Sequence, residues 1–215
     1  MNYLSVIIFF AIYLAVAVIP GYVFFSTRAG TSDFPIFPLF GLYAFFLVWA
    51  QIMIGTNMGV LRRTLGLPWM LTFHMWEGGI AFLFALLHPL FAYLALGGPL
   101  GVFKAYQGNG LYILLGYLAI TLMTVTVLTA LLRKVAWLRD RWHTIHYANY
   151  VIFLLAWIHS FNIGSDVQST GLRYLWMFYG VTTFASFAAR MWRKKIKPRL
   201  AAATVTTTSL DKPQS

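Results

Sequence analysis

The chain has 215 residues, of which 60% are hydrophobic, 18% are aromatic and only 10% are charged, with a formal net charge of +11. This balance excludes a water-soluble globular domain, in which roughly 25% of the residues are charged. The absence of cysteine excludes disulfides, thiolate-ligated iron–sulfur clusters and catalytic thiols, so redox chemistry in this chain requires a bound cofactor.

Long apolar stretches recur along the chain, each near the roughly 20 residues that cross about 30 Å of hydrocarbon as a helix. Six of them lie at 3–25, 36–58, 70–95, 108–132, 142–163 and 171–191. The first is expected to be a helix and not a signal peptide, because no positive segment precedes it and its apolar residues continue to Phe25. We therefore predict an all-α integral membrane protein. Its six-helix transmembrane bundle spans residues 1–197, and a disordered cytoplasmic tail follows at 198–215.

Positive residues lie mostly on one side of such a bundle, and short cytoplasmic loops retain Lys and Arg. Three cations lie on one side, namely Arg28, Lys104 and Arg173. The other thirteen lie on the opposite side, namely Arg62, Arg63, Arg133, Lys134, Arg139, Arg141, Arg190, Arg193, Lys194, Lys195, Lys197, Arg199 and Lys212. We therefore expect a multi-pass protein of the plasma (inner) membrane with both termini in the cytoplasm. The positive charge then reports topology and not nucleic-acid binding.

Four histidines form two pairs on the third and fifth apolar stretches. His74 and His88 are fourteen residues apart, and His146 and His159 are thirteen residues apart. At about 1.5 Å per residue these separations are about 21 Å and about 19.5 Å, so both helices present histidines at two matching depths. Ionisable side chains are costly in hydrocarbon, and ligation of haem iron by neutral imidazole compensates that cost. The pattern predicts two stacked haems, one between His74 and His146 and the other between His88 and His159.

Helix geometry supports the third predicted helix as a carrier of two ligands better than the fifth. At about 100° per residue, His74 and His88 lie within about 40° of each other, whereas His146 and His159 differ by about 140°. The fifth helix therefore needs a tilt, a local π or 3₁₀ turn, or a long side-chain reach. Choosing His143 in place of His146 lengthens the separation to about 24 Å, a poorer match. The alternative for all four histidines is an interior role in which they bond to backbone or to one another.

The same segments resemble a known family, the ferric reductase-like transmembrane domain of ferric reductases, NADPH oxidases and smaller bacterial haem membrane proteins. Residues 71–78 followed by His88 resemble its third helix, and residues 142–146 with Tyr150 resemble its fifth. The resemblance covers the second to sixth predicted helices. It implies that two b-type haems carry electrons across the membrane, and that their ligands are His74, His146, His88 and His159.

The chain departs from the larger relatives in two ways. The second predicted helix lacks the buried arginine of the NADPH oxidases and offers only Gln51 and Asn57, which argues against superoxide production. No glycine-rich fingerprint follows a predicted strand, so we expect no flavin or nicotinamide domain fused to the bundle. The electron donor is then expected to be a separate cytoplasmic-side flavoprotein or a quinol, which brings its own flavin or quinone. Ferric iron, oxygen, a quinone or a periplasmic reductase fit as acceptors on the outer side.

The predicted function is thus transmembrane electron transfer by a di-haem b-type cytochrome, as a ferric reductase-like oxidoreductase or as an electron-transfer subunit of one. A haem-binding bundle without a fused dehydrogenase domain is also similar to the haem membrane subunit of periplasmic methionine sulfoxide reductase. Two alternatives stay open. One is a haem-bearing membrane anchor subunit of a periplasmic reductase, and the other is a non-redox transporter whose histidines relay protons or bind metal.

Charged residues near the histidines each have more than one interpretation. Arg63 on the cytoplasmic side and Arg173 on the outer side are candidates to bind haem propionates, although topology accounts for such cations equally well. Glu77 is the only carboxylate that we place inside a helix. It is expected to bond a histidine ring, to relay a proton, or to pair with Arg62 or Arg63.

Small and aromatic residues near the predicted ligands provide weaker indications. Gly78 and Gly79 would let a porphyrin approach the third helix closely, or would serve ordinary helix packing. Trp76 and Trp157 are close to predicted ligands and are candidates to line the haem pockets.

Overall fold

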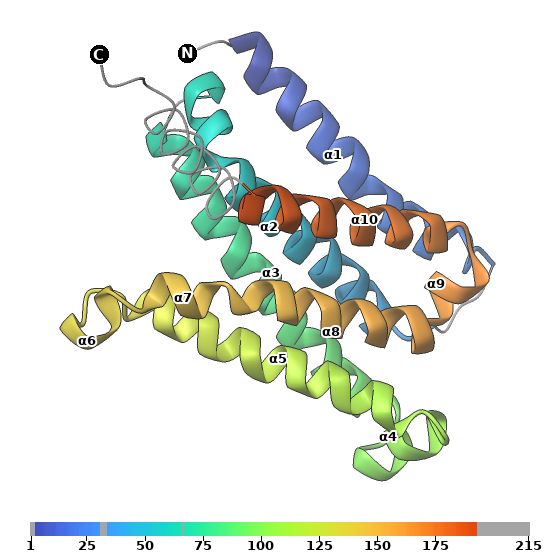
Figure 1. Ribbon diagram of the computed structural model, residues 1–215. Helices are drawn as coiled ribbons and strands as arrows, with labels where there is room; N and C mark the ends of the chain where they lie inside the picture. The colour runs from blue at the N-terminus through green and yellow to red at the C-terminus, as the bar shows by residue number, and fades with distance from the viewer. Residues whose placement is uncertain (1–2, 31–33, 66, 193–215) are drawn as a thin grey trace, which may run out of the picture.

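The computed structural model describes residues 3–30, 34–65 and 67–192, without the side chains of residues 67, 68 and 143. Throughout this part, the regular elements are helices (Figure 1). The predicted all-α fold is therefore confirmed. The predicted tail at 198–215 and its preceding cations lie outside the described residues.

Four helices are long and apolar enough to cross a membrane, and they match the first four predicted spans. They are α1 (Tyr3–Ser26), α2 (Phe37–Leu65), α3 (Leu67–Ala95) and α5 (Gly110–Leu131). Helix α3 ends where Gly97 and Gly98 adopt φ values of 74° and 88°, a left-handed backbone that favours glycine.

The last two predicted spans are built differently. The fifth is divided at Tyr147 into α7 (Trp142–His146) and α8 (Ala148–Ile163), and the sixth corresponds to α10 (Leu172–Met191). Neither α8 nor α10 is among the four helices that meet the length and hydropathy expected of a span. Three short helices that we did not predict lie between the long ones: α4 (Pro99–Ala105), α6 (Ala136–Arg139) and α9 (Ser165–Ser169).

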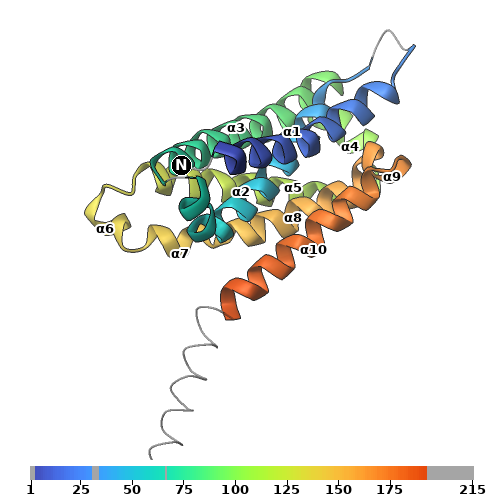
Figure 2. The ribbon, with the colours of Figure 1, turned by 90° about the horizontal axis from the view of Figure 1, so that it is seen from above.

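Helix α2 is the central element of the bundle and contacts α1, α3, α8 and α10. It runs antiparallel to α3, because Gly41 lies against His88 while Gly55 lies against His74. Helix α5 packs on α8 in the same antiparallel sense, with Gly116 against His159. The views in Figures 1 and 2 place α6 at one end of the bundle and α4 and α9 at the other.

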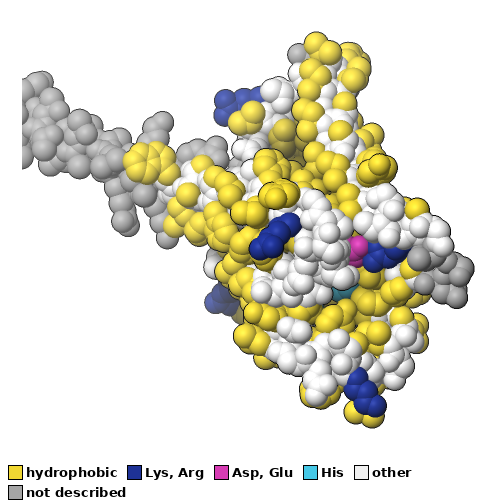
Figure 3. Space-filling view, turned by 90° about the vertical axis from the view of Figure 1, so that its right-hand side faces the viewer, with side chains coloured by type: hydrophobic (Ala, Val, Ile, Leu, Met, Phe, Trp, Pro, Cys, Tyr) yellow, Lys and Arg dark blue, Asp and Glu magenta, His cyan; other side chains and the backbone are white. Residues whose placement is uncertain are grey.

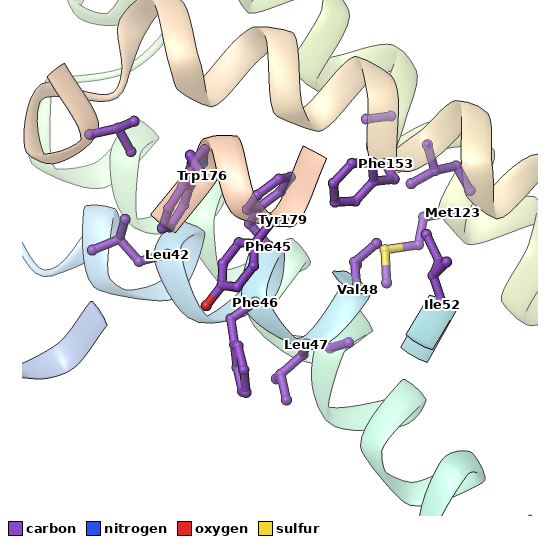
Figure 4. Close-up of a cluster of buried hydrophobic side chains, with 14 of the residues drawn as sticks. Leu42, Phe45, Phe46, Leu47, Val48, Ile52, Met123, Phe153, Trp176 and Tyr179 are labelled. Atoms are coloured by element: carbon purple, nitrogen blue, oxygen red, sulfur yellow. The ribbon is translucent and has the colours of Figure 1, made fainter. Parts of the chain in front are cut away.

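Aromatic side chains fill the interface of α2, α8 and α10 (Figure 4). The ring of Phe45 stacks between Phe153 and Trp176, with centroid distances of 5.0 Å on both sides. Trp49 stacks on Tyr179 at 4.4 Å. Each such pair adds about 0.5–1.5 kcal/mol beyond its area burial, so this cluster holds α8 and α10 against the central helix.

Candidate functional site

His88 and His159 face each other across the bundle near the end that carries α4 and α9. Their ring centroids are 6.2 Å apart and their planes differ by 86°. The Nδ1 of His88 donates to the carbonyl oxygen of Phe37 at 2.8 Å, and the Nδ1 of His159 donates to that of Tyr112 at 2.7 Å. A carbonyl only accepts, so in the neutral rings Nδ1 bears the proton and Nε2 keeps a free lone pair. This arrangement is typical of metal-binding histidine.

Two glycines make room for these rings, and sequence reasoning missed both. A Cβ on Gly41 would lie 2.8 Å from Nδ1 of His88, and a Cβ on Gly116 would lie 2.6 Å from Nδ1 of His159. Real Cβ atoms essentially never approach another atom so closely, so a side chain at either position would force the imidazole ring to shift. One signal was present in the sequence. Gly41 and Gly55 are fourteen residues apart, the same spacing as His74 and His88 on the antiparallel neighbour.

A cavity adjoins the His88–His159 pair and contains about 1350 Å³ of non-protein space, including a part open to the surroundings. Its walls are mostly apolar side chains from α2, α3, α5 and α8, among them Val48, Ala119 and Ile152. Tyr106, which directly follows α4, and Asp166 of α9 complete the wall toward the end of the bundle. In Figure 3 a histidine side chain is visible at this end between apolar side chains, below a carboxylate and a cation.

His74 and His146 form the second pair, toward the end that carries α6. Their ring centroids are 6.4 Å apart, with an interplanar angle of 74°. The Nδ1 of His74 is buried and has no hydrogen-bond partner within the described part of the chain. Gly55 lies beside this ring, because its Cβ would be 3.6 Å from it. The amide of Asn149 lies 3.3 Å from Nε2 of His146, a contact that sequence reasoning also missed.

A turn, one of the three adjustments expected of the fifth helix, is found directly after His146. The helix is interrupted at Tyr147, whose N–H bonds to the oxygen of Thr144 at 3.1 Å, and the N–H of Tyr150 bonds to the oxygen of Tyr147 at 3.2 Å. Both are three-residue spacings of the 3₁₀ type. Each residue in such a turn advances the side-chain direction by about 120° instead of about 100°, which rotates His146 toward the face of His159.

The spacing of both pairs fits a metal ion between two imidazoles. A metal–nitrogen bond of about 2.0 Å plus roughly 1.1 Å within each ring places the two centroids about 6.2 Å apart. The observed distances are 6.4 Å and 6.2 Å. No cluster of three or more His, Cys, Asp or Glu side chains that could hold a metal occurs in the described ranges. Two protein ligands at each site therefore suit a metal that brings a planar ligand set of its own, as haem iron does.

Glu77 is 3% exposed, and its contacts differ from those predicted. Its Oε1 accepts a hydrogen bond from the hydroxyl of Tyr13 on α1 at 3.1 Å, and its Oε2 accepts one from the amide nitrogen of Gln51 on α2. Pairing with Arg62 or Arg63 was wrong, since neither arginine forms an ion pair with Glu77 within the described chain. Nor does Glu77 bond a histidine ring there.

The expectation that only Glu77 among the carboxylates lies in a helix was also wrong. Asp166 lies in the short helix α9 and is 5% exposed. Its carboxylate binds the guanidinium of Arg28 through two contacts, of 2.5 Å and 3.0 Å. The pair joins the end of α1 to α9, and Asp166 at the same time lines the cavity beside His88 and His159.

The two arginines predicted to bind propionates lie at opposite ends of the bundle. Arg63 is exposed in the last turn of α2, the helix end nearer to His74. Arg173 is exposed at the start of α10, and its guanidinium carbon lies 5.1 Å from the ring centroid of Phe161. Neither arginine is among the residues that line the cavity.

The weaker indications are corrected by burial and packing. Trp76 is 72% exposed, so it points away from the histidines. Trp157 donates its indole N–H to the carbonyl oxygen of Trp176 at 2.9 Å and so belongs to the α8–α10 interface. A Cβ on Gly78 would lie 3.3 Å from the Gln51 side chain, whereas one on Gly79 would meet nothing within 4 Å. Gly78 therefore serves helix packing. The side chain of His143 lies outside the described residues.

The fold and site together define a multi-pass membrane protein with paired histidines inside a helical bundle. The family model described as ferric reductase like transmembrane component matches residues 40–157, more than half of the chain. The chain belongs to this family. The matched segment includes His74, His88 and His146 and ends two residues before His159. Neither the curated proteins nor the solved structures contain a match to this chain.

Proposed function

We propose that this protein is a di-haem b-type cytochrome that carries electrons across the membrane. The observation that carries the proposal is the pair of opposed imidazoles at each of two depths, with centroids 6.4 Å and 6.2 Å apart. His74 and His146 would hold one iron, and His88 and His159 would hold the other. Membership of the ferric reductase-like family supports a redox role for these sites.

The residues around each pair act by orientation and exclusion of water. The carbonyls of Phe37 and Tyr112 hold His88 and His159 in the tautomer whose Nε2 could bind iron, and such partners would also make the ligand more basic. The mostly apolar walls of the cavity would limit the access of water to the His88–His159 pair. A haem held by both imidazoles of a pair would supply one-electron transfer. The protein would then exchange electrons with its donor and acceptor without binding them to iron.

The direction of transfer follows from the distribution of cations. Arg133, Lys134, Arg139 and Arg141 surround α6, near the His74–His146 pair. By the positive-inside rule that end would face the cytoplasm, and we propose that the membrane is the plasma (inner) membrane. Electrons would enter there from a separate flavoprotein or a quinol and leave near His88 and His159. Ferric iron, oxygen, a quinone or a periplasmic reductase would accept them.

The cations nearest each end are proposed to bind the propionates. Arg63 would serve the haem of the cytoplasmic end, and Arg173 would serve that of the outer end, because guanidinium binds carboxylates in a bidentate fashion. We also propose that the haem-binding domain spans residues 1–197 and that residues 198–215 form a cytoplasmic tail.

A reduced-minus-oxidised optical spectrum and a haem-to-protein ratio test the proposal. The wild type is expected to hold two haems, and His74→Ala and His88→Ala are each expected to lose one, because one imidazole alone holds b-type haem weakly. The matched control is His143→Ala, which is expected to keep both haems. Absence of haem from wild-type protein expressed with adequate haem supply would overturn the proposal and favour a transporter.

A further inference from the structure

Glu77 presents an electrostatic problem inside the bundle. It is 3% exposed on α3, a helix that is apolar enough to span a membrane. An ionised carboxylate in hydrocarbon is costly unless it is paired, and such residues in membrane helices usually mark a functional site. The two groups that bond it, Tyr13 and Gln51, are neutral. Its ionised form therefore needs a compensating positive charge from elsewhere.

The other charged and titratable groups around Glu77 do not supply that charge. On α3 the nearest is the His74 ring, three residues away, which pairs with His146 of α7. At the end of α5, the guanidinium of Arg133 approaches the sulfur of Met75, at 3.8 Å. In the described ranges the ion pairs are Arg28–Asp166 and Arg139–Asp140, and neither includes Glu77.

Gln51 connects Glu77 to the His74 site without direct contact between the two. One amide nitrogen donates both to the carboxylate of Glu77 and to the backbone oxygen of His74, the latter at 2.8 Å. Gly78 allows this approach, since a Cβ there would press on the Gln51 side chain. The carboxylate is thereby held one helical turn from the ligand of the proposed iron.

We propose that Glu77 is a proton-binding site linked to the redox state of the iron held by His74 and His146; this inference rests on the proposed function. A ferric haem core carries one net positive charge, because the porphyrin dianion cancels two of three, and a bound metal is the largest local charge in its site. That charge compensates the Glu77 carboxylate. One-electron reduction removes it, and Glu77 then binds one proton drawn from water. No bond to iron forms or breaks.

The hydrogen bonds identify the oxygen that takes the proton. An amide nitrogen only donates, so Oε2 facing Gln51 must stay an acceptor. A phenol hydroxyl both donates and accepts, so Tyr13 can turn its proton away and accept one from Oε1. Protonation therefore occurs at Oε1, and Tyr13 is a positioning residue that satisfies the carboxylate in both states.

Glu77 is the sole glutamate of the chain, which permits a test without mutation. Full-length haem-loaded protein labelled with ¹³C-glutamate is compared with unlabelled protein by redox-triggered infrared difference spectroscopy. On reduction, a carbonyl band of a protonated carboxylic acid is expected to appear, and it should shift with the label. A spectrum in which the haems reduce but no label-sensitive carboxyl band changes would overturn the proposal.

Redox titration at several pH values gives the second readout. The midpoint potential of one of the two one-electron steps is expected to fall by about 59 mV for each unit rise in pH. This corresponds to a tenfold change in the equilibrium constant of that step. In Glu77→Gln that step should become independent of pH and stay at its higher, acidic-limit potential, because the negative charge that favours ferric iron is gone. Asp140→Asn removes an exposed carboxylate and should keep the wild-type slope.

The outcomes separate this proposal from the one on which it rests. A wild type without haem would overturn the proposed function itself. A wild type with two haems and pH-independent steps would overturn only the role of Glu77. If Glu77→Gln does not assemble, Tyr13→Phe decides, because it keeps the carboxylate but removes the hydroxyl that accepts a hydrogen bond from the protonated Oε1. The labelled band should then shift in frequency, and an unchanged band would contradict the assignment of Oε1.

Discussion

At the scale of single residues, the four histidines depend on what faces them from the neighbouring helix. Gly41 and Gly116 occupy positions at which a Cβ would lie 2.8 Å and 2.6 Å from an imidazole nitrogen. Small residues let transmembrane helices approach closely. Here they also set the position of each ring, because the same rings donate to backbone carbonyls on α2 and α5 or at their ends. The glycine and the carbonyl together fix one orientation for the His88 ring and one for the His159 ring.

This dependence predicts the effect of a single methyl group. Gly41→Ala would force the His88 ring to move, at a cost of about 1–3 kcal/mol for overpacking. The displaced ring would no longer oppose His159, so we expect loss of about one of two haems, measured as the haem-to-protein ratio. Gly79→Ala is the matched control, since its Cβ meets nothing within 4 Å, and it should keep both haems. Full haem content in Gly41→Ala would contradict this account.

At the scale of elements, the interruption at Tyr147 is the feature that aligns the fifth predicted helix with the third. An unbroken helix would point His146 and His159 about 140° apart. The 3₁₀-type bonds between Thr144 and Tyr150 reduce that angle while the helix continues. Each pair can therefore form although the two separations in sequence are unequal.

An insertion tests the role of this turn. One alanine added after Tyr147 would rotate α8 relative to α7 by about 100° and shift it by about 1.5 Å. His146 and His159 would no longer both face α3, so about one haem should be lost, as judged by the optical spectrum. One alanine added after Gly108, in the turn between α4 and α5, is the control and should leave the spectrum unchanged. Retention of two haems after the insertion at Tyr147 would show that the turn is dispensable.

At the scale of the whole molecule, the bundle has two distinct ends. The end with α4 and α9 carries Lys104 and the Arg28–Asp166 ion pair beside the cavity. The end with α6 carries Arg133, Lys134, Arg139 and Arg141. Since positive loops stay in the cytoplasm, the asymmetry predicts how the protein sits in its membrane.

The absence of cysteine makes this orientation simple to measure. Single variants Lys104→Cys and Lys134→Cys place one exposed thiol at each end of the bundle. A membrane-impermeant maleimide added to intact cells should label the first and not the second, and inverted vesicles should give the opposite result. The reverse labelling would place α6 outside and would reverse the proposed direction of electron transfer.

The sequence by itself determined the fold class, the first four spans and the pairing of His74 with His146 and of His88 with His159. Hydropathy and periodicity act within one segment, and rise per residue converts sequence separation into depth. These quantities can be computed for one helix without knowledge of its neighbours. The same periodicity therefore showed that the fifth predicted helix needs an adjustment between His146 and His159.

Only the tertiary structure decided what each of these residues contacts. It showed that Glu77 bonds to Tyr13 and Gln51 and not to an arginine. It identified Asp166 as a second buried carboxylate. It also showed that Gly41, and not Gly78, makes room beside a histidine ring. It also turned Trp76 outward. Each outcome depends on the rotation of one helix against another, which is set by side-chain packing between distant segments and not by the period of any single helix.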